Sequence, residues 1–447
     1  MKVVLISTYE MGRQPFGLAS PAAWLERAGA EVACLDLSRE PLLEEAVRAA
    51  GLVAFYVPMH TATRLAARLV PRVHSLNPTA HLCFYGLYAP VNEEFLRSLG
   101  AGTILGGEFE AGLVSLVNRL HEERSSVQSE PVISLERLKF IVPDRTGLLP
   151  LGEYARLIAG DSRRTVGYTE ASRGCKHLCR HCPIVPVYQG HFRVVERDVV
   201  LEDIRRQVAA GARHITFGDP DFFNGVGHAV AIVRRLHEEF PTLTYDATIK
   251  ISHLLEHREH LATLRETGCL FVTSAVESIN DRVLALLDKG HTRADFLEVL
   301  RLCREARLTL SPTFVTFTPW TTLEDYRDLL GLLAATDLVP NVAPIQLAIR
   351  LLIPAGSRLL ELPEVLALVG EFDQAALSYR WPHPDPRMDR LCAGIQALVK
   401  RAENQRATRL EIFREVWKLA FNGPAPPDTS DRIDRAAIPY INEPWYC

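Results

Sequence analysis

SRGCKHLCRHCP, residues 172–183, is the stretch of this chain that says most about its fold and chemistry. It places three thiols, those of Cys175, Cys179 and Cys182, on one short segment. Cysteine thiolates are the usual protein ligands of iron–sulfur clusters, so three of them on one loop can hold three irons of a 4Fe-4S cubane. No fourth ligand stands nearby, which leaves one iron open to the amino and carboxylate groups of a cofactor. We therefore predict a cluster site at these three cysteines.

A zinc ion is the alternative occupant of this segment. Zinc sites use paired cysteines or add histidine ligands, and His177 or His181 is close enough in sequence to supply one. A purely structural metal would make the chain a non-enzymatic ligand-sensing protein, which is the alternative from a different functional class. Metal analysis of the purified protein separates the two interpretations.

The cysteines follow the first strand of a repeated strand–helix pattern between residues 161 and 360. Amphipathic segments with helical spacing alternate there with β-rich runs. Six such runs are visible: TVGYTEAS, HITFGDPDF, TYDATIK, LFVTSAVES, LTLSPTFVTF and PIQLAIRLLI. Six parallel strands with intervening helices predict a partial (β/α)6 barrel of the TIM type, which builds its active site at the carboxyl ends of its strands.

A second pattern of this kind occupies residues 1–122, so the fold class is α/β. Five β-rich runs predict a doubly wound, Rossmann or flavodoxin-like parallel sheet, with its ligand site outside the carboxyl ends of the strands. Residues 123–160 are polar and rich in proline and glycine, which indicates a linker. Residues 361–447 are predicted to form a helical C-terminal region that ends in a short tail with Cys447.

Composition narrows the classes of partner. Hydrophobic residues make up 47% of the 447 residues and charged residues 23%, which is typical of a globular protein with a large core. The formal net charge of -4 offers no basic surplus for phosphates, so we expect a small-molecule or peptide substrate and no nucleic acid. The chain shows neither an export signal nor a long apolar run. We therefore expect a cytoplasmic protein with no membrane partner.

The spacing Cys-x3-Cys-x2-Cys after the first barrel strand resembles the radical S-adenosylmethionine superfamily, over roughly residues 165–360. That resemblance implies a 4Fe-4S cluster, S-adenosylmethionine as a cofactor that is cleaved reductively, and a reducing partner such as flavodoxin or ferredoxin. It also implies cofactor contacts at the ends of later strands. Gly218 and Asp219 occupy the turn that meets the methionine amino group, although the usual glycine-rich form is altered here. Glu277 and Ser278 resemble the pair near the ribose hydroxyls.

Three further side chains are candidates for the same cofactor. Ser311 and Thr313 lie on the fifth predicted strand, and Arg350 lies on the sixth. Arg350 stands in an apolar run, where an unpaired cation is costly, so it should meet a carboxylate. That carboxylate is either the methionine carboxylate of the cofactor or a structural acidic side chain.

The doubly wound domain before the barrel resembles the cobalamin-binding members of the superfamily, many of which are methyltransferases. Loops that contain Thr8 and Tyr9, and the turn Gly106-Gly107-Glu108, would then approach a corrin, and glycine there permits close backbone contact. The chain lacks the Asp-x-His-x-x-Gly signature of a cobalt-ligating histidine. The alternative is a degenerate domain that packs against the barrel and binds nothing, because fold alone does not establish function.

The end of the chain resembles a subgroup of radical enzymes named for a Cys-Sec-Ala-Glu-Pro or Cys-Cys-Ala-Glu-Pro tail. The match stops one residue short, at Cys447, so we hypothesise that the reading frame continues through a selenocysteine codon. A thiol and selenol pair would bind a soft atom such as arsenic or selenium. Cys447 is therefore a candidate catalytic residue, and transfer of the 3-amino-3-carboxypropyl group of the cofactor to a soft atom is the alternative to cobalamin-dependent methylation.

Overall fold

A six-stranded parallel sheet forms the first part of the molecule in the computed structural model, which describes residues 1–122, 129–405, 407–423 and 439–442. The strand order is β2-β1-β3-β4-β5-β6, which is the flavodoxin-like order extended by one strand. The strands are β1 (Lys2–Ser7), β2 (Glu31–Asp36), β3 (Leu52–Tyr56), β4 (His81–Tyr85), β5 (Thr103–Gly107) and β6 (Ile133–Ser134).

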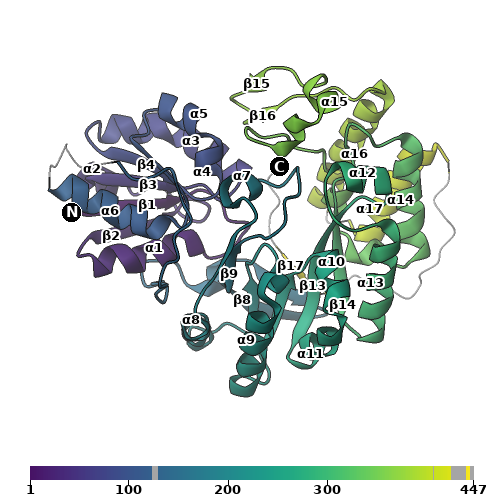
Figure 1. The fold of residues 1–447 in the computed structure, drawn as a ribbon, viewed down its shortest axis with the longest axis horizontal. Helices are drawn as coiled ribbons and strands as arrows, with labels where there is room; N and C mark the ends of the chain where they lie inside the picture. The colour runs from purple at the N-terminus through teal and green to yellow at the C-terminus, as the bar shows by residue number, and fades with distance from the viewer. Residues whose placement is uncertain (123–128, 406, 424–438, 443–447) are drawn as a thin grey trace.

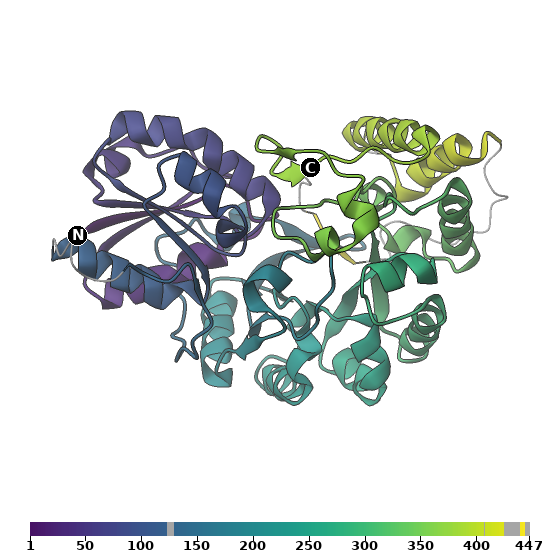
Figure 2. The same cartoon turned by 45° about the horizontal axis from the view of Figure 1, so that its top comes forward.

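Helices cover both faces of this sheet, as Figures 1 and 2 show. Alternate residues of β1 point to opposite faces. Val3 and Leu5 pack in the apolar cluster that α1 and α6 complete. Val4 and Ile6 pack in the cluster that α3 completes. The helices are α1 (Phe16–Arg27), α2 (Glu44–Ala49), α3 (His60–Leu76), α4 (Tyr88–Val91), α5 (Glu93–Ser98) and α6 (Phe109–His121).

The sixth strand, β6, lies in the segment expected to be a linker. The backbone N–H of Gly106 donates to the carbonyl of Val132, and β6 pairs in parallel with β5. Gly107 has φ +69°, and a Cβ at this position would lie 2.1 Å from the Ser134 carbonyl oxygen, so only glycine lets the two strands approach. A two-residue strand is too short to leave a period-2 pattern, which is why the sequence did not predict it.

The second sheet is curled and has the order β14-β13-β12-β11-β8-β7-β17. Its first five members are parallel, whereas β7 and β17 run antiparallel at one edge. The strands are β7 (Arg156–Ala159), β8 (Ser162–Thr169), β11 (His214–Phe217), β12 (Thr244–Thr248), β13 (Cys269–Glu277), β14 (Thr309–Phe314) and β17 (Tyr440–Ile441). This curled parallel sheet is the expected partial barrel.

Helices line the outer side of the second sheet, and two long C-terminal helices extend that layer (Figure 1). At the end of this layer, α17 packs against both α14 and α16. The helices are α8 (Arg197–Ala209), α9 (Val226–Glu239), α10 (Ile251–Glu256), α11 (Leu261–Glu266), α12 (Asp281–Leu286), α13 (Arg293–Glu305), α14 (Leu323–Ala335), α16 (Pro386–Asn404) and α17 (Arg409–Phe421). None of the helices in the described ranges has the length and apolar character needed to cross a membrane.

Two segments differ from their expected secondary structure. The sixth β-rich run forms only a single parallel bridge between Phe317 and Arg350, and it begins with the 3-10 helix Pro344–Leu347. Pro344 cannot donate to a ladder and favours a first helical turn. Residues after 361 begin as a short helix, α15 (Pro363–Leu366), and continue into a hairpin of β15 (Phe372–Asp373) and β16 (Ser378–Tyr379) rather than a long helix.

Candidate active site

The three predicted cluster ligands lie on the loop that leaves the barrel at the carboxyl end of β8. Between β8 and the loop runs β9 (Ser172–Gly174), which pairs antiparallel with β10 (Phe192–Val194), and α7 (Val185–Tyr188) follows the loop. All three thiols are free; Cys179 is buried, whereas Cys175 and Cys182 are half-buried. Three free thiols on one turn are a donor set that fits an iron–sulfur cluster with one open iron.

The loop is fastened to its surroundings by backbone contacts. The N–H of Arg180 donates to the Leu287 carbonyl at 2.9 Å, and the Arg358 guanidinium donates to the Leu178 carbonyl at 2.7 Å. Burial raises the pKa of the Cys182 thiol to about 12 in the metal-free chain. Since metals bind thiolates, cluster binding here must release protons.

Asp219, a predicted cofactor ligand, anchors the base of the loop. Its carboxylate accepts from the Ala171 backbone N–H at 2.9 Å and from the Ser172 hydroxyl at 2.6 Å. Burial raises the pKa of Asp219 to about 6, although these hydrogen bonds oppose the shift. The Asp219 side chain therefore fixes the strand that leads into the cysteines.

Glu277 closes a second contact to the loop. It has φ +68°, a conformation that non-glycine residues rarely adopt. Its carboxylate lies 3.1 Å from His181 Nε2 and 3.4 Å from Lys289 Nζ. Burial alone would raise the pKa of Glu277, but the Lys289 cation and the His181 hydrogen bond outweigh it and hold the pKa at about 2. An ionised Glu277 thus ties β13 to the cysteine loop, and the hydroxyl of Ser278 accepts from the Asn280 N–H.

A cavity of about 370 Å³ opens at the barrel interior. Four predicted cofactor residues line it: Gly218, Asp219, Ser311 and Thr313. At Gly218 a Cβ would lie 1.8 Å from the hydroxyl oxygen of Tyr168, so this position must be glycine for the tyrosine to keep its place. Polar strand-end groups in a cavity of this size fit part of a nucleoside cofactor.

Arg350 does not reach this cavity. Its guanidinium donates to Asp389 at 2.6 Å and to the Trp381 carbonyl at 2.5 Å, and it lies over the Trp381 ring at 3.6 Å. The carboxylate that Arg350 meets in the structure is therefore the side chain of Asp389.

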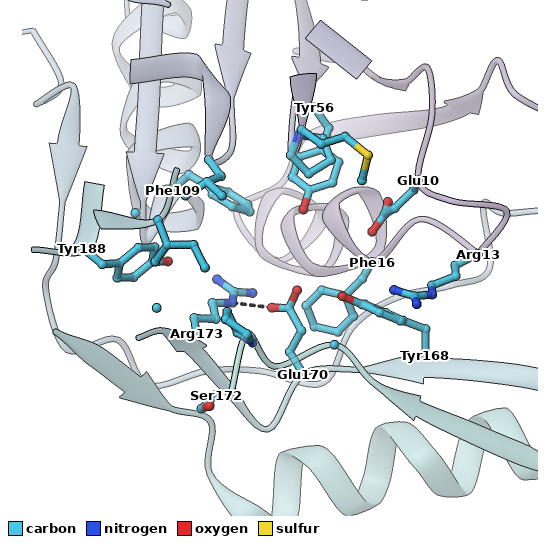
Figure 3. A pocket seen from close by; sticks show the side chains of 18 of the residues that line it. Glu10, Arg13, Phe16, Tyr56, Phe109, Tyr168, Glu170, Ser172, Arg173 and Tyr188 are labelled. Atoms are coloured by element: carbon cyan, nitrogen blue, oxygen red, sulfur yellow. Dashed lines mark hydrogen bonds and ion pairs between the residues drawn. The ribbon is translucent and has the colours of Figure 1, made fainter. Parts of the chain in front are cut away.

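A smaller cavity, of about 180 Å³, lies between the first sheet and the cysteine loop (Figure 3). The two cavities adjoin, because five residues line both: Met11, Arg13, Tyr168, Gly218 and Pro220. Arg173, two residues before Cys175, stands beside this smaller cavity. It lies 2.7 Å from Glu110, 2.8 Å from Glu170 and 3.3 Å from Glu108.

Two of the carboxyl groups around Arg173, those of Glu108 and Glu170, have raised pKa values. Burial raises the pKa of Glu108 to about 7 and that of Glu170 to about 7, because desolvation outweighs the opposing effect of the Arg173 cation. Burial also raises the pKa of Glu10 well above its usual range. The cavity therefore holds acidic groups that can carry a proton near pH 7.

The predicted corrin contacts lie at this cavity or behind it. Gly107 lines it, and Glu108 accepts from the Tyr188 hydroxyl at 3.3 Å. The Thr8 hydroxyl instead donates to the Ala62 carbonyl, Tyr9 is buried, and Gly106 pairs with β6.

The smaller cavity alone is too small for a corrin. Pockets for drug-sized ligands measure roughly 300–1,000 Å³, and a corrin is larger than such ligands. The cavity here is smaller than that range, and aromatic rings such as those of Tyr56 and Phe109 fill its walls.

One predicted site residue, Cys447, lies outside the described residues, and several residues of the site were not predicted. Arg173, Glu170 and Lys289 were not predicted as site residues, and His181 was considered only as a zinc ligand, although Glu170, Arg173 and His181 flank or interrupt the cysteines. Their roles depend on partners that are tens of residues away in the sequence, such as Glu108 and Glu277.

Comparisons with known proteins match the part of the chain that contains the cysteine loop. The Radical SAM superfamily model matches residues 169–333. A tRNA-2-methylthio-N(6)-dimethylallyladenosine synthase of Desulfosudis oleivorans is 26% identical over 190 residues, which cover 39% of each protein. Its counterpart in Chlorobium phaeobacteroides is 28% identical over 169 residues, or 36% of this chain and 38% of that protein. The chain thus spans about two fifths of the length of these curated relatives.

Two groups of solved structures share more of the architecture. The radical S-adenosylmethionine methyltransferase TsrM from Kitasatospora setae, solved with cobalamin and a [4Fe-4S] cluster, has a TM-score of 0.60 and 19% identity over 75% of this chain and 70% of that one. The cobalamin-dependent radical enzyme OxsB, solved with aqua-cobalamin and S-adenosylmethionine, has a TM-score of 0.71 and 14% identity over 90% of this chain and 66% of that one. At these identities the likeness shows the shared fold.

Proposed function

We propose, from the premise that residues 169–333 form a radical SAM domain, that this chain is an enzyme that cleaves S-adenosylmethionine reductively to modify an unactivated substrate. Cys175, Cys179 and Cys182 would hold the 4Fe-4S cluster, which supplies the single electron for the cleavage when it is bound. The observation that carries the proposal is the set of three free thiols on one loop at the carboxyl end of β8.

The chain's own residues orient this site. Asp219 fixes the strand before the loop, and Glu277 with Lys289 fixes the loop from the opposite side through His181. Rigid support matters because radical chemistry depends on holding the reacting atoms in place and keeping water out. These residues position the cluster ligands rather than contact the substrate.

The barrel cavity is the proposed place of the cofactor. Gly218 would let the backbone approach it, and the Ser311 and Thr313 hydroxyls supply hydrogen bonds. The adjoining smaller cavity would then receive the substrate. Glu170, which lines the smaller cavity, can hold or give a proton there near neutral pH, which suits a general acid or base.

A small molecule or a peptide side chain is the proposed substrate. Cavities of about 180 and 370 Å³ suit a group of that size, and the net charge of -4 disfavours a phosphate backbone. The curated relatives carry names of tRNA-modifying enzymes, so a tRNA substrate is the competing proposal. Salt-dependent binding of bulk tRNA in a filter assay would favour it.

Cobalamin-dependent methylation is a second candidate. What favours it is that the carboxyl ends of the first sheet and the cysteine loop line one cavity, in a fold shared with two cobalamin-containing enzymes. The cavity would have to open before a corrin could enter. Cobalamin retained in about equimolar amount after anaerobic purification supports this candidate, and none retained after incubation with hydroxocobalamin removes it.

The test of the cluster is metal content after anaerobic reconstitution. We expect about four irons and four sulfides per chain in the wild type. A Cys175→Ala/Cys179→Ala/Cys182→Ala variant should contain almost none, whereas Cys392→Ala, a buried core cysteine on α16, should match the wild type. Zinc without iron on the three cysteines would instead support the structural-metal alternative.

A further inference from the structure

Three side chains next to the cysteine loop converge without a role in the proposed reaction. His177 belongs to the loop, Asp221 follows β11, and His253 lies on α10. His177 Nε2 lies 3.2 Å from His253 Nε2 and 3.7 Å from Asp221 Oδ2, and His253 Nδ1 lies 2.7 Å from Asp221 Oδ2. One possible ligand atom from each of the three residues therefore lies within 4.8 Å of the other two.

Two of these atoms are buried and unsatisfied. The side chains of Asp221 and His253 are 2% and 1% exposed, and His177 is 23% exposed. Among the described residues, neither Asp221 Oδ2 nor His253 Nδ1 has a partner with hydrogen-bond geometry, although the two atoms face each other. Leaving a buried carboxylate oxygen and an imidazole nitrogen unbonded is costly, so a further group that approaches Asp221 and His253 from the side of His177 would stabilise them.

A metal ion satisfies these atoms together. Two imidazoles and one carboxylate are a donor set of zinc and of iron(II) enzymes. Zinc bonds to nitrogen and oxygen of about 2.0–2.2 Å place tetrahedral ligand atoms roughly 3.3–3.5 Å apart. The two separations from His177 Nε2, 3.2 Å to His253 Nε2 and 3.7 Å to Asp221 Oδ2, lie on either side of that value. His253 would therefore coordinate through Nε2, while its Nδ1 stays beside Asp221 Oδ2 at 2.7 Å.

We propose that His177, Asp221 and His253 form a second metal site, for a divalent ion of the zinc and iron(II) class, beside the cysteine loop. Because its ligands come from the loop and from the ends of two neighbouring barrel strands, the ion would clamp the cysteine loop to the barrel. Three protein ligands also leave a coordination position open to water or to a substrate oxygen. The ion is separate from the cluster, since no cysteine takes part.

The decisive experiment removes the cysteines first. The Cys175→Ala/Cys179→Ala/Cys182→Ala variant, purified anaerobically, is titrated with Zn²⁺ and then with Co²⁺ as a spectroscopic probe. We expect about one zinc ion per chain, and visible Co²⁺ bands without the thiolate-to-metal absorption of a cysteine site. An absence of zinc binding in this variant would overturn the proposal, and a hydrogen-bonded Asp221–His253–His177 chain would then replace it.

Ligand variants locate the ion within the same background. His253→Ala and His177→Ala should each weaken zinc binding at least about tenfold. His257→Ala removes a neighbouring half-buried histidine just after α10, and it should leave zinc binding unchanged. Retained binding in both ligand variants contradicts the assignment. A circular-dichroism melt shows that each variant is folded, and iron content in the cysteine-intact chain tests the cluster independently.

Discussion

Arg173 gives the most quantitative test of how the two domains meet. Its side chain is 7% exposed, and the carboxylates of Glu108, Glu110 and Glu170 surround it at 2.7–3.3 Å. Arg173→Met keeps much of the volume but leaves these carboxylates without their cation. Removal of one partner from a buried ion pair costs about 3–5 kcal/mol, so we expect the free energy of unfolding to fall by about that amount near pH 8.

The loss should shrink as the pH falls. The folded pKa values of Glu108 and Glu170 are about 7, above their ordinary value of 4.5. Protonation of these two groups therefore stabilises the folded state at low pH, and this stabilisation is lost as the pH rises through 7. The Arg173 cation lowers both pKa values, so its removal raises them further. At about pH 6 the variant should hold neutral carboxyls and lose less stability than at about pH 8.5.

The assay is urea unfolding followed by tryptophan fluorescence at the two pH values. Arg205→Met is the matched control, because Arg205 pairs with Glu239 at 2.8 Å on the surface and should cost at most about 1 kcal/mol. Adding Glu110→Gln to Arg173→Met should recover part of the loss. An equal loss at both pH values, or a loss no larger than that of the control, would refute the buried-network account.

Three further outcomes follow from the site. Glu277→Gln should shorten the lifetime of the reconstituted cluster against an iron chelator at about pH 7, where a pKa of about 2 keeps Glu277 ionised in the wild type. An unchanged lifetime in the variant contradicts its positioning role. Gly218→Ala should lower the free energy of unfolding in urea by about 1–3 kcal/mol. In a chain that already carries Tyr168→Ala, the same substitution should cost much less, because the clashing ring is gone. An equal cost in both backgrounds contradicts the steric explanation. Arg350→Gln should leave the equilibrium affinity for S-adenosylmethionine unchanged while lowering the melting temperature, and a large loss of affinity would assign Arg350 to the cofactor instead of Asp389.

Much of the fold follows from local pattern. The unbroken apolar run Val3, Val4, Leu5 and Ile6 predicts a strand with two buried faces, and two such faces require helices on both sides. The barrel strands are predicted in the same way from long β-rich runs. Short or interrupted elements escape this argument: β6 has two residues, and the run after Pro344 forms a 3-10 helix and one bridge.

The site is harder to predict because its contacts are distant in sequence. The spacing of the cysteines carries their chemistry within one loop, so sequence alone suffices for that prediction. Two partners of Arg173, Glu108 and Glu110, lie more than 60 residues before it. The partners of Glu277 include His181, 96 residues before it. Gly218 illustrates the same limit, since its need for glycine arises from Tyr168 on a neighbouring strand. Such pairs become visible only when β8, β11 and β13 are placed side by side.

The central claim is that the cysteine loop supports reductive cleavage of S-adenosylmethionine. The most direct measurement is product analysis by mass spectrometry after the reconstituted, anaerobic protein is mixed with dithionite and S-adenosylmethionine. We expect 5'-deoxyadenosine from the wild type and none from the Cys175→Ala/Cys179→Ala/Cys182→Ala variant. Methylthioadenosine in its place would indicate 3-amino-3-carboxypropyl transfer, and no cleavage product from a chain with a full complement of iron would contradict the account.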